Sequence, residues 1–297
     1  MPLHLKRISP YVNKIIKAKG AYHFPKYNLT GQSSFIFALL CGVRGAGKSV
    51  ALLNLLNIEK EHLLKDESIV YLVSPTRDAK IDDFVEKHPE NVKYYDELST
   101  DVFNKIINDI KGRIEDWKAT KYVFQLFERF LKDGANLLEE EEMAVLVDSG
   151  ILDESTDVKK MIDEFNHAHP PRSSLCIDDS MGSPIISSSN SKQGKEAVRW
   201  FIRHRHFYCN VFILSQHFRG ISKPIRSNTN MVLLWPSKDR SVLKSIFDEF
   251  SPLFKGKIEN YEEALDLLDT QSHQFLLMYY DEIKQLRLGF DRLITFE

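Results

Sequence analysis

The most informative stretch of this 297-residue chain is Gly42-Val43-Arg44-Gly45-Ala46-Gly47-Lys48-Ser49. It matches the spacing G-x-x-x-x-G-K-[ST] at every fixed position. One apolar run, residues 35–41, precedes it, and a second, residues 50–56, follows it. We therefore predict a buried strand, a glycine-rich loop and a helix, in that order. The alternative, a chance match in a glycine-containing turn, does not explain the two flanking runs.

This loop predicts a binding site for a nucleoside triphosphate. Its glycines let backbone N–H groups point inward, and the N-terminus of the following helix adds its positive dipole end, so the loop forms a cradle for phosphates. Lys48 would reach the β- and γ-phosphates, and the Ser49 hydroxyl would hold Mg²⁺. We expect residues 42–50, including Val50, to contact the nucleotide, with ATP and Mg²⁺ as cofactors.

Composition and charge limit the classes of protein to which the chain can belong. The formal net charge is -2, which excludes a globally basic nucleic-acid binder, so contact with DNA would need a local patch or a surface built by several subunits. Cys41, Cys176 and Cys209 lie in or beside apolar runs, which predicts buried thiols in a reducing compartment. We recognise no secretory signal and no run of roughly 20 apolar residues, so we expect a soluble, intracellular protein without a membrane segment.

The order of apolar runs predicts an α/β fold with a mainly parallel central sheet flanked by helices. Residues 68–75 form a second buried strand ended by proline, and residues 91–95 a weaker third. A series of strand, helix and strand is typical of a parallel sheet covered by helices. Further strands are predicted at 173–179, 211–214 and 231–235, helices at about 195–206 and 242–250, and a final strand pair at 275–280 and 286–296.

The predicted organisation is a basic N-terminal arm, residues 1–30, followed by a P-loop domain, residues 31–297. The arm would pack against the core or a neighbour, or form a solvated tail. Within the domain, apolar residues at helical spacing between about 100 and 168 predict an inserted helical layer. Its acidic run, Glu139–Glu142, could be a metal or basic-partner site, although such runs usually form a solvated helix face. Residues 181–193, rich in Ser, Gly and Asn, predict a flexible loop.

Three polar residues follow predicted strands, where a P-loop enzyme needs them. Asp178 ends a short apolar strand and would hold Mg²⁺, whereas Asp179 would point to the other side and polarise the attacking water. Paired acids after a strand also occur as helix caps or solvated turns. Gln216 ends the next apolar strand and could sense the γ-phosphate, or it could be a loop glutamine in solvent.

Basic residues cluster around that last strand. A neighbouring subunit's arginine can stabilise charge on a transferred phosphoryl group, although several of these arginines could instead be surface residues or DNA-phosphate contacts. The aromatic residues among them are more often core than base-stacking platforms. His204 and His206 lack the spacing of a zinc site. The basic residues are Arg199, Arg203, Arg205, Arg219, Lys223 and Arg226, and the aromatic residues are Trp200, Phe201, Phe207 and Tyr208.

Together these motifs resemble the FtsK/HerA superfamily of ring-forming, DNA-translocating ATPases. Within it they are similar to the genome-packaging ATPases of poxviruses, other large DNA viruses and virophages. The phosphate loop is shared by many families, whereas the arginine, short turn, apolar strand and glutamine over residues 205–216 are more specific. The resemblance spans about residues 35–236, and it also includes Asp178-Asp179, residues 91–98 and Ile225-Arg226-Ser227-Asn228.

This resemblance implies a RecA-like ATPase fold and roles for individual residues. Lys48 and Ser49 would bind nucleotide and Mg²⁺, Asp178 would hold the metal, Asp179 would act as base and Gln216 as sensor. Arg205 would reach into the adjacent subunit, with Arg226 as second candidate. Asp179 departs from the glutamate of the cellular branch and is similar to the viral branch.

The resemblance also implies a motor that packages viral double-stranded DNA into a preformed capsid. The expected partners are double-stranded DNA, further copies of the chain in a pentameric or hexameric ring, and a capsid or portal-vertex protein. The expected location is the host cytoplasm, a viral factory or the virion.

Other functions of a P-loop protein stay open at this point. A nucleotide or small-molecule kinase would need an arginine-bearing lid and an acceptor pocket, which no stretch singles out. A nucleotide-gated assembly or scaffold protein would bind nucleotide with negligible turnover. A GTPase lacks support because the guanine-reading motif [NT]-K-x-D is missing, and Lys238-Asp239 has no intervening residue.

Overall fold

The computed structural model describes residues 3–7, 35–64, 68–77, 79–134, 138–152, 169–179, 183–187, 191–237, 239–268, 273–281 and 284–296. The chain divides into two compact units: Met1–Ile106 together with Arg172–Glu297, and Ile107–Pro171. Within the described residues, no helix combines the length and the apolar character that crossing a membrane requires.

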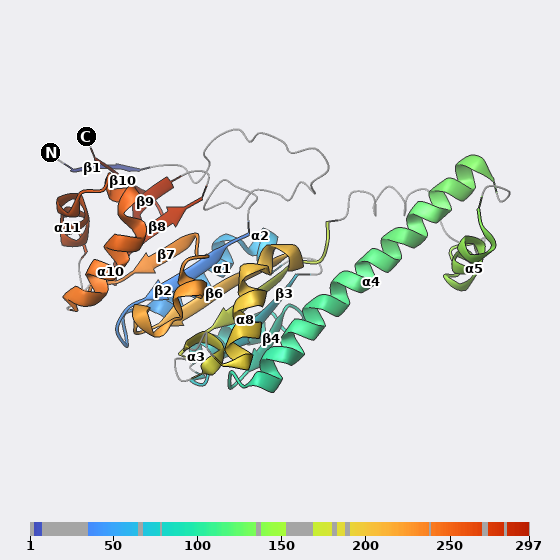
Figure 1. The fold of residues 1–297 in the computed structure, drawn as a ribbon, viewed down its shortest axis with the longest axis horizontal. Helices are drawn as coiled ribbons and strands as arrows, with labels where there is room; N and C mark the ends of the chain where they lie inside the picture. Colours follow the sequence, from blue (N-terminus) through green and yellow to red (C-terminus); the bar gives the residue numbers. More distant parts are fainter. Residues whose placement is uncertain are drawn as a thin grey trace. The chain divides into compact units, whose positions relative to one another are not determined.

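The first unit is built on one sheet whose central strands are parallel (Figure 1). In the described ranges the strand order is β1-β10-β9-β8-β7-β2-β6-β5-β3-β4. Neighbours from β4 to β7 run parallel, and the pairs from β7 to β1 run antiparallel. The predicted α/β fold is therefore confirmed. The strands are β1 (Leu3–Arg7), β2 (Phe37–Cys41), β3 (Ile69–Val73), β4 (Val92–Tyr95), β5 (Ser173–Ile177), β6 (Cys209–Ser215), β7 (Met231–Leu234), β8 (Leu276–Tyr280), β9 (Lys284–Leu288) and β10 (Arg292–Phe296).

Helices cover both faces of the sheet, which is why strands β2, β5 and β6 are buried at every position. On one face Ala38 and Leu40 join the core that contains Leu55 of α1, whereas on the other face Phe37 contacts Phe201 of α8. Helices of this unit are α1 (Lys48–Ile58), α2 (Lys60–Leu63), α3 (Ala79–Lys87), α7 (Pro184–Ser187), α8 (Lys192–Ile202), α9 (Lys223–Arg226), α10 (Arg240–Phe250) and α11 (Ile258–Asp266), with the 3₁₀ turns η2 (His204–Phe207), η3 (Phe218–Gly220) and η4 (Ser251–Phe254).

Two buried asparagines fix the start of β2 between its neighbours. The Asn210 Oδ1 atom accepts a hydrogen bond from the Ile36 N–H at 2.9 Å. On the other side, the Asn230 Oδ1 accepts from the Phe37 N–H at 2.8 Å, and its Nδ2 donates to the Phe35 carbonyl at 3.0 Å. Both side chains therefore satisfy backbone groups that no water reaches, at the strand that leads into the glycine-rich loop.

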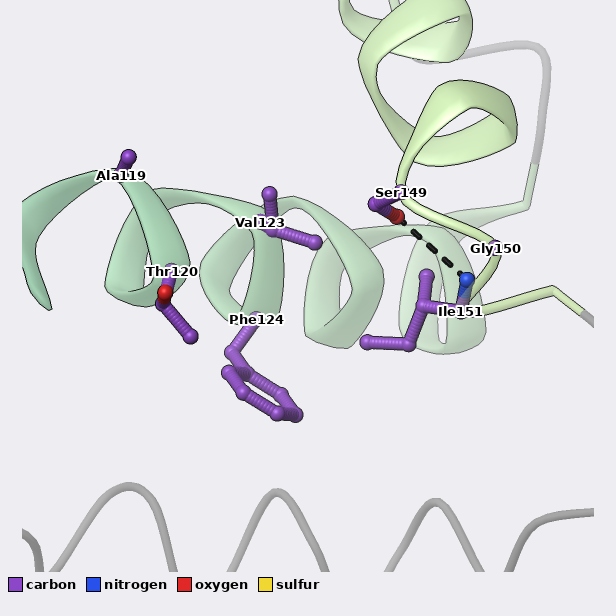
Figure 2. A pocket seen from close by; sticks show the side chains of 7 residues that line it. All are labelled: Ala119, Thr120, Val123, Phe124, Ser149, Gly150 and Ile151. Carbon is purple, nitrogen blue, oxygen red and sulfur yellow. Dashed lines mark hydrogen bonds between the residues drawn. The ribbon is translucent and has the colours of Figure 1, made fainter. Parts of the chain in front are cut away.

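The second unit, Ile107–Pro171, consists in its described residues of most of α4 (Thr100–Asp133) together with α5 (Glu140–Asp148). Its small core contains Phe124, Phe127 and Leu146. A cavity of about 430 Å³ opens beside this core, where the Ile151 N–H donates to the Ser149 hydroxyl at 3.4 Å (Figure 2). Its lining residues are Ala119, Thr120, Val123, Phe124, Ser149, Gly150 and Ile151.

The acidic run of the second unit forms the start of α5. Glu139 is the N-cap residue of a capping box with Glu142, whose carboxylate also accepts a hydrogen bond from Arg129 Nη1 at 2.8 Å. The side chains of residues 139–141 are exposed. The solvated helix face is therefore the correct interpretation, and these acids stabilise the helix N-terminus.

Several elements differ from the prediction. The C-terminal segment forms three strands rather than a pair, because Gly289, with a φ of 66°, allows a tight turn between β9 and β10. The predicted loop at 181–193 contains α7 and the start of α8, which the Ser191 hydroxyl caps by accepting from the Gly194 N–H at 2.9 Å. Helix α8 ends at Ile202 rather than 206, since the chain turns through η2 into β6.

The predicted arm is described at residues 3–7 alone, where β1 pairs with β10 at the sheet edge. Residues 8–30 lie outside the described residues, as do 181–182 and 188–190 of the predicted loop. The proposed domain boundaries stay a prediction.

Candidate nucleotide-binding site

The glycine-rich loop joins β2 to α1, as predicted, and its backbone geometry explains why glycine occupies three of its positions. Gly45 has a φ of 77° and Gly47 a φ of 98°, both in the left-handed region that side chains disfavour. At Gly42 the constraint is space, because a Cβ atom there would lie 2.8 Å from the Trp235 Cβ. The loop is therefore closed tightly against β7 at one end and turned into the helix at the other.

Lys48 folds back over this loop. Its Nζ donates hydrogen bonds to the carbonyls of Gly42 at 2.8 Å and Val43 at 3.0 Å. Burial lowers the pKa of Lys48, and the carboxylates of Asp178 and Asp179 act in the opposite direction. The ammonium is thus held at the loop mouth by neutral carbonyl acceptors, which a phosphate could replace as a stronger partner.

Asp178 meets Ser49 directly beyond the end of β5. The Asp178 N–H donates to the Val73 carbonyl at 2.8 Å, so the backbone is still tied to β3 at this position. The Ser49 hydroxyl donates to the Asp178 Oδ2 at 3.0 Å, and Asp178 is 7% exposed. Burial raises the pKa of Asp178, whereas the Ser49 hydrogen bond and the Lys48 charge oppose that rise.

The pair fits a magnesium ion by its donor chemistry. A carboxylate and a hydroxyl are the hard oxygen ligands that Mg²⁺ prefers, with water and phosphate oxygens completing its octahedron. In the described ranges no group of three or more His, Cys, Asp or Glu side chains is placed to hold a metal ion. A metal at Ser49 and Asp178 would therefore depend on the bound nucleotide for further ligands.

Asp179 turns away from Asp178 although the two are adjacent. Its φ of 46° lies in the left-handed region, which aspartate tolerates better than most residues. The exposed carboxylate accepts a hydrogen bond at its Oδ1 from Gln216 Nε2 at 3.1 Å. Because β5 and β6 are neighbours in the sheet, the residues after their carboxyl ends meet. The structure thus brings together the acid and the amide that the sequence singled out.

One cavity of about 390 Å³ collects these side chains. It also contains Thr76 and Lys80, which follow β3 and which the sequence analysis missed. The available signal was their position, since segments after the carboxyl ends of parallel strands line the ligand crevice. The lining residues are Arg44, Gly45, Gly47, Lys48, Ser49, Val50, Thr76, Lys80, Asp178, Asp179, Leu214, Ser215 and Gln216.

The two candidate arginine fingers lie elsewhere. Arg205 belongs to η2, before β6, whereas Gln216 follows β6, so the two residues lie at opposite ends of this central strand. The Arg205 side chain is 51% exposed, with its Nη2 3.9 Å from the Asp281 carboxylate. Arg226 is bound within its own chain, because its Nη2 donates to Glu249 at 2.9 Å and its Nη1 to the Ile221 carbonyl at 2.6 Å. In the described part of the chain, neither lines the cavity.

The remaining predicted groups around β6 are structural. Trp200 and Phe201 are buried, as the core interpretation expects. His204 is buried with its Nδ1 2.6 Å from the Cys209 carbonyl, and burial lowers the pKa of His204 to about 4. Cys41, Cys176 and Cys209 are free and buried, as predicted. Burial raises the pKa of Cys41 to about 12, so the thiol nearest the loop is inert.

No family model and no curated protein matches the sequence. Among solved structures, the genome packaging NTPase B204 from Sulfolobus turreted icosahedral virus 2 in complex with AMP has a TM-score of 0.47 and 12% identity, covering 86% of this chain and 96% of that chain. EssC (ATPases 2 and 3) from Geobacillus thermodenitrificans has a TM-score of 0.42 and 13% identity, covering 87% of this chain and 38% of that chain. The pCW3 conjugation coupling protein TcpA has a TM-score of 0.42 and 15% identity, covering 86% of this chain and 60% of that chain.

Proposed function

We propose that the chain is an ATPase whose hydrolysis drives double-stranded DNA through a homo-oligomeric ring into a preformed viral capsid. The observation that carries the ATPase assignment is a pair of hydrogen bonds across one cavity: Ser49 to Asp178, and Gln216 to Asp179. The first pair has the chemistry of a metal site, and the second has that of a water-positioning site.

Each group of residues has its own role in the hydrolysis. The loop N–H groups and Lys48 bind the phosphates, and Ser49 and Asp178 would hold Mg²⁺, which would neutralise phosphate charge when bound. The Asp179 carboxylate accepts a proton from the attacking water, and the Gln216 amide fixes the orientation of that carboxylate.

The motor assignment rests on the motif resemblance and on the position of Arg205. Arg205 is exposed and lies before the amino end of β6, whereas the nucleotide site lies beyond its carboxyl end. In a ring, an arginine in this position can reach the nucleotide site of a neighbouring subunit. A ring also concentrates a few basic side chains of each copy in one channel, so the near-neutral net charge is compatible with DNA binding.

The test is steady-state ATP hydrolysis with and without long double-stranded DNA, across protein concentration and at low and moderate salt. We expect the rate per subunit to rise with DNA and with concentration, and the DNA stimulation to fall as salt screens phosphate contacts. The Lys48→Ala variant provides the background rate. A rate indifferent to DNA and to concentration would contradict the motor, and tight ATP binding without turnover would favour a nucleotide-gated scaffold.

A further inference from the structure

A second cavity of about 390 Å³ adjoins the phosphate loop and shares Gly45, Gly47, Val50 and Lys80 with the first. We propose that it receives the nucleobase and ribose of the bound nucleotide, an assignment that rests on the nucleotide-binding function proposed above. Its lining residues are Gly45, Gly47, Val50, Ala51, Asn54, Lys80, Trp235, His273, Phe275 and Phe290.

The position of this cavity follows from the strand order. Asp178 and Gln216 follow β5 and β6, which lie on one side of β2, whereas Trp235 follows β7, which lies on the other side. The glycine-rich loop leaves β2 between them, and Gly45 and Gly47 line both cavities. A ligand held by its phosphates in the loop therefore has its γ end toward the acids and its opposite end toward Trp235.

The chemistry of the walls fits a planar heterocycle. The ring centroids of Trp235 and Phe275 lie 4.9 Å apart, and those of Phe275 and Phe290 lie 5.0 Å apart in an edge arrangement. Trp235 and Phe275 are 1% and 8% exposed, so they form the base of the wall, and the partly buried Phe290 is the ring on which a nucleobase can stack. The Asn54 amide and the His273 imidazole add polar groups at the rim. The His273 ring packs over the loop, with its Cβ 3.6 Å from where a Cβ on Gly47 would stand.

Hydrogen bonds hold this aromatic wall in place. The Trp235 N–H donates to the Cys41 carbonyl at 3.0 Å, which ties the wall to the strand that carries the loop. The Trp235 Nε1 donates to the His273 carbonyl at 3.2 Å. The Gly289 N–H donates to the Phe275 carbonyl at 2.8 Å, and buried Arg287 donates from Nη1 to the Phe290 carbonyl at 2.9 Å. A preformed wall of this kind loses little conformational freedom when a ligand binds.

The test compares ATP with inorganic triphosphate, which has the phosphates without base or ribose, by calorimetric titration in the presence of Mg²⁺. We expect ATP to bind the unmodified chain at least about tenfold more tightly than triphosphate, because the base adds stacking. Phe290→Ala should reduce that ratio about tenfold. His273→Ala, at an exposed residue, should reduce it as well without touching the core.

Tyr280→Ala is the matched control, since Tyr280 is an aromatic residue of β8 that is 37% exposed and outside the cavity. It should leave the ratio unchanged. The proposal is overturned if ATP and triphosphate bind the unmodified chain equally, or if both variants weaken the two ligands by the same factor. If neither ligand binds at all, the nucleotide-binding function itself fails, and the base site fails with it.

Discussion

Replacing Asp179 by asparagine should abolish most ATP hydrolysis while leaving ATP binding intact. The change is isosteric, and the asparagine carbonyl oxygen can still accept the Gln216 Nε2 hydrogen bond that now spans 3.1 Å. Asparagine also tolerates the left-handed backbone, with its φ of 46°, that Asp179 adopts. Because the side chain is exposed, the substitution creates no cavity. What it removes is the negative charge and the capacity to take a proton from water.

The size of the effect follows from that single loss. A positioned general base contributes about 10²- to 10⁴-fold in rate, so we expect the turnover number to fall by this factor. Asp178, which is 7% exposed and bonded to Ser49, keeps the metal and phosphate geometry, so the affinity for ATP should change by less than about threefold. The substitution should therefore lower the turnover number and leave the affinity for ATP nearly unchanged.

The assay measures steady-state turnover, ATP affinity by calorimetry and thermal unfolding for three proteins. These are the unmodified chain, Asp179→Asn and the control Asp248→Asn, which alters an exposed aspartate of α10 outside the site. Equal hydrolysis by Asp179→Asn and the control would refute the base assignment. A parallel loss of ATP affinity would instead make Asp179 a binding residue.

Three further predictions concern the subunit contact and the stability of the fold. Arg205→Ala should lose ATPase activity while keeping its affinity for ATP. Mixing it with inactive Asp179→Asn should restore part of the hydrolysis, because each variant supplies the residue that the other lacks. No recovery on mixing would count against action between subunits. Asn230→Ala leaves the Phe37 N–H and the Phe35 carbonyl without their buried partner, so urea titration should show a loss of about 2–5 kcal/mol in unfolding free energy, and a loss below about 1 kcal/mol would contradict this. Burial lowers the pKa of His204 from 6.5 to about 4, so between these values the unfolded chain binds the proton more readily than the folded chain. The unfolding free energy should therefore fall by about 2 kcal/mol between about pH 7 and pH 5. The His204→Asn variant should show a weaker pH dependence.

The sequence predicts much of the phosphate side of the site, though not Thr76 and Lys80, because the predicted residues follow a strand or a loop with a local signature. Lys48 and Ser49 are defined by the glycine spacing, while Asp178 and Gln216 are defined by the ends of apolar runs. A parallel sheet places all such ends at one edge, so adjacency in space follows once the strands are known to be neighbours. The order β2-β6-β5, which tertiary packing sets, is the remaining step.

The base side of the site could not be predicted in this way. Trp235 lies directly after β7, Phe275 directly before β8 and Phe290 in the turn after β9, and their contact depends on antiparallel pairing that reverses the chain at two places. As single aromatic residues at strand ends they look like ordinary core. The turn that carries Phe290 depends on Gly289, which the sequence analysis left inside one continuous strand. Long-range pairing of this kind has no local signature.

The position of Arg205 bears on how a complete site can be assembled. Strand β6 is 7 residues long, or about 23 Å at roughly 3.3 Å per residue, and it lies between Arg205 and Gln216, so Arg205 does not line the nucleotide cavity of its own chain. If Arg205 stabilises the transferred phosphoryl group, the amino ends of the parallel strands in one subunit must face the carboxyl ends of the parallel strands in another. Such a contact joins two different surfaces head to tail, and repeated around a rotation axis it closes into a ring. Contacts in a twofold dimer are reciprocal, so such a dimer would bring Arg205 to the partner's nucleotide only if one surface patch carried both Arg205 and the nucleotide site. Arginine action between subunits therefore requires an assembled site, and hydrolysis that depends on Arg205 should also depend on protein concentration.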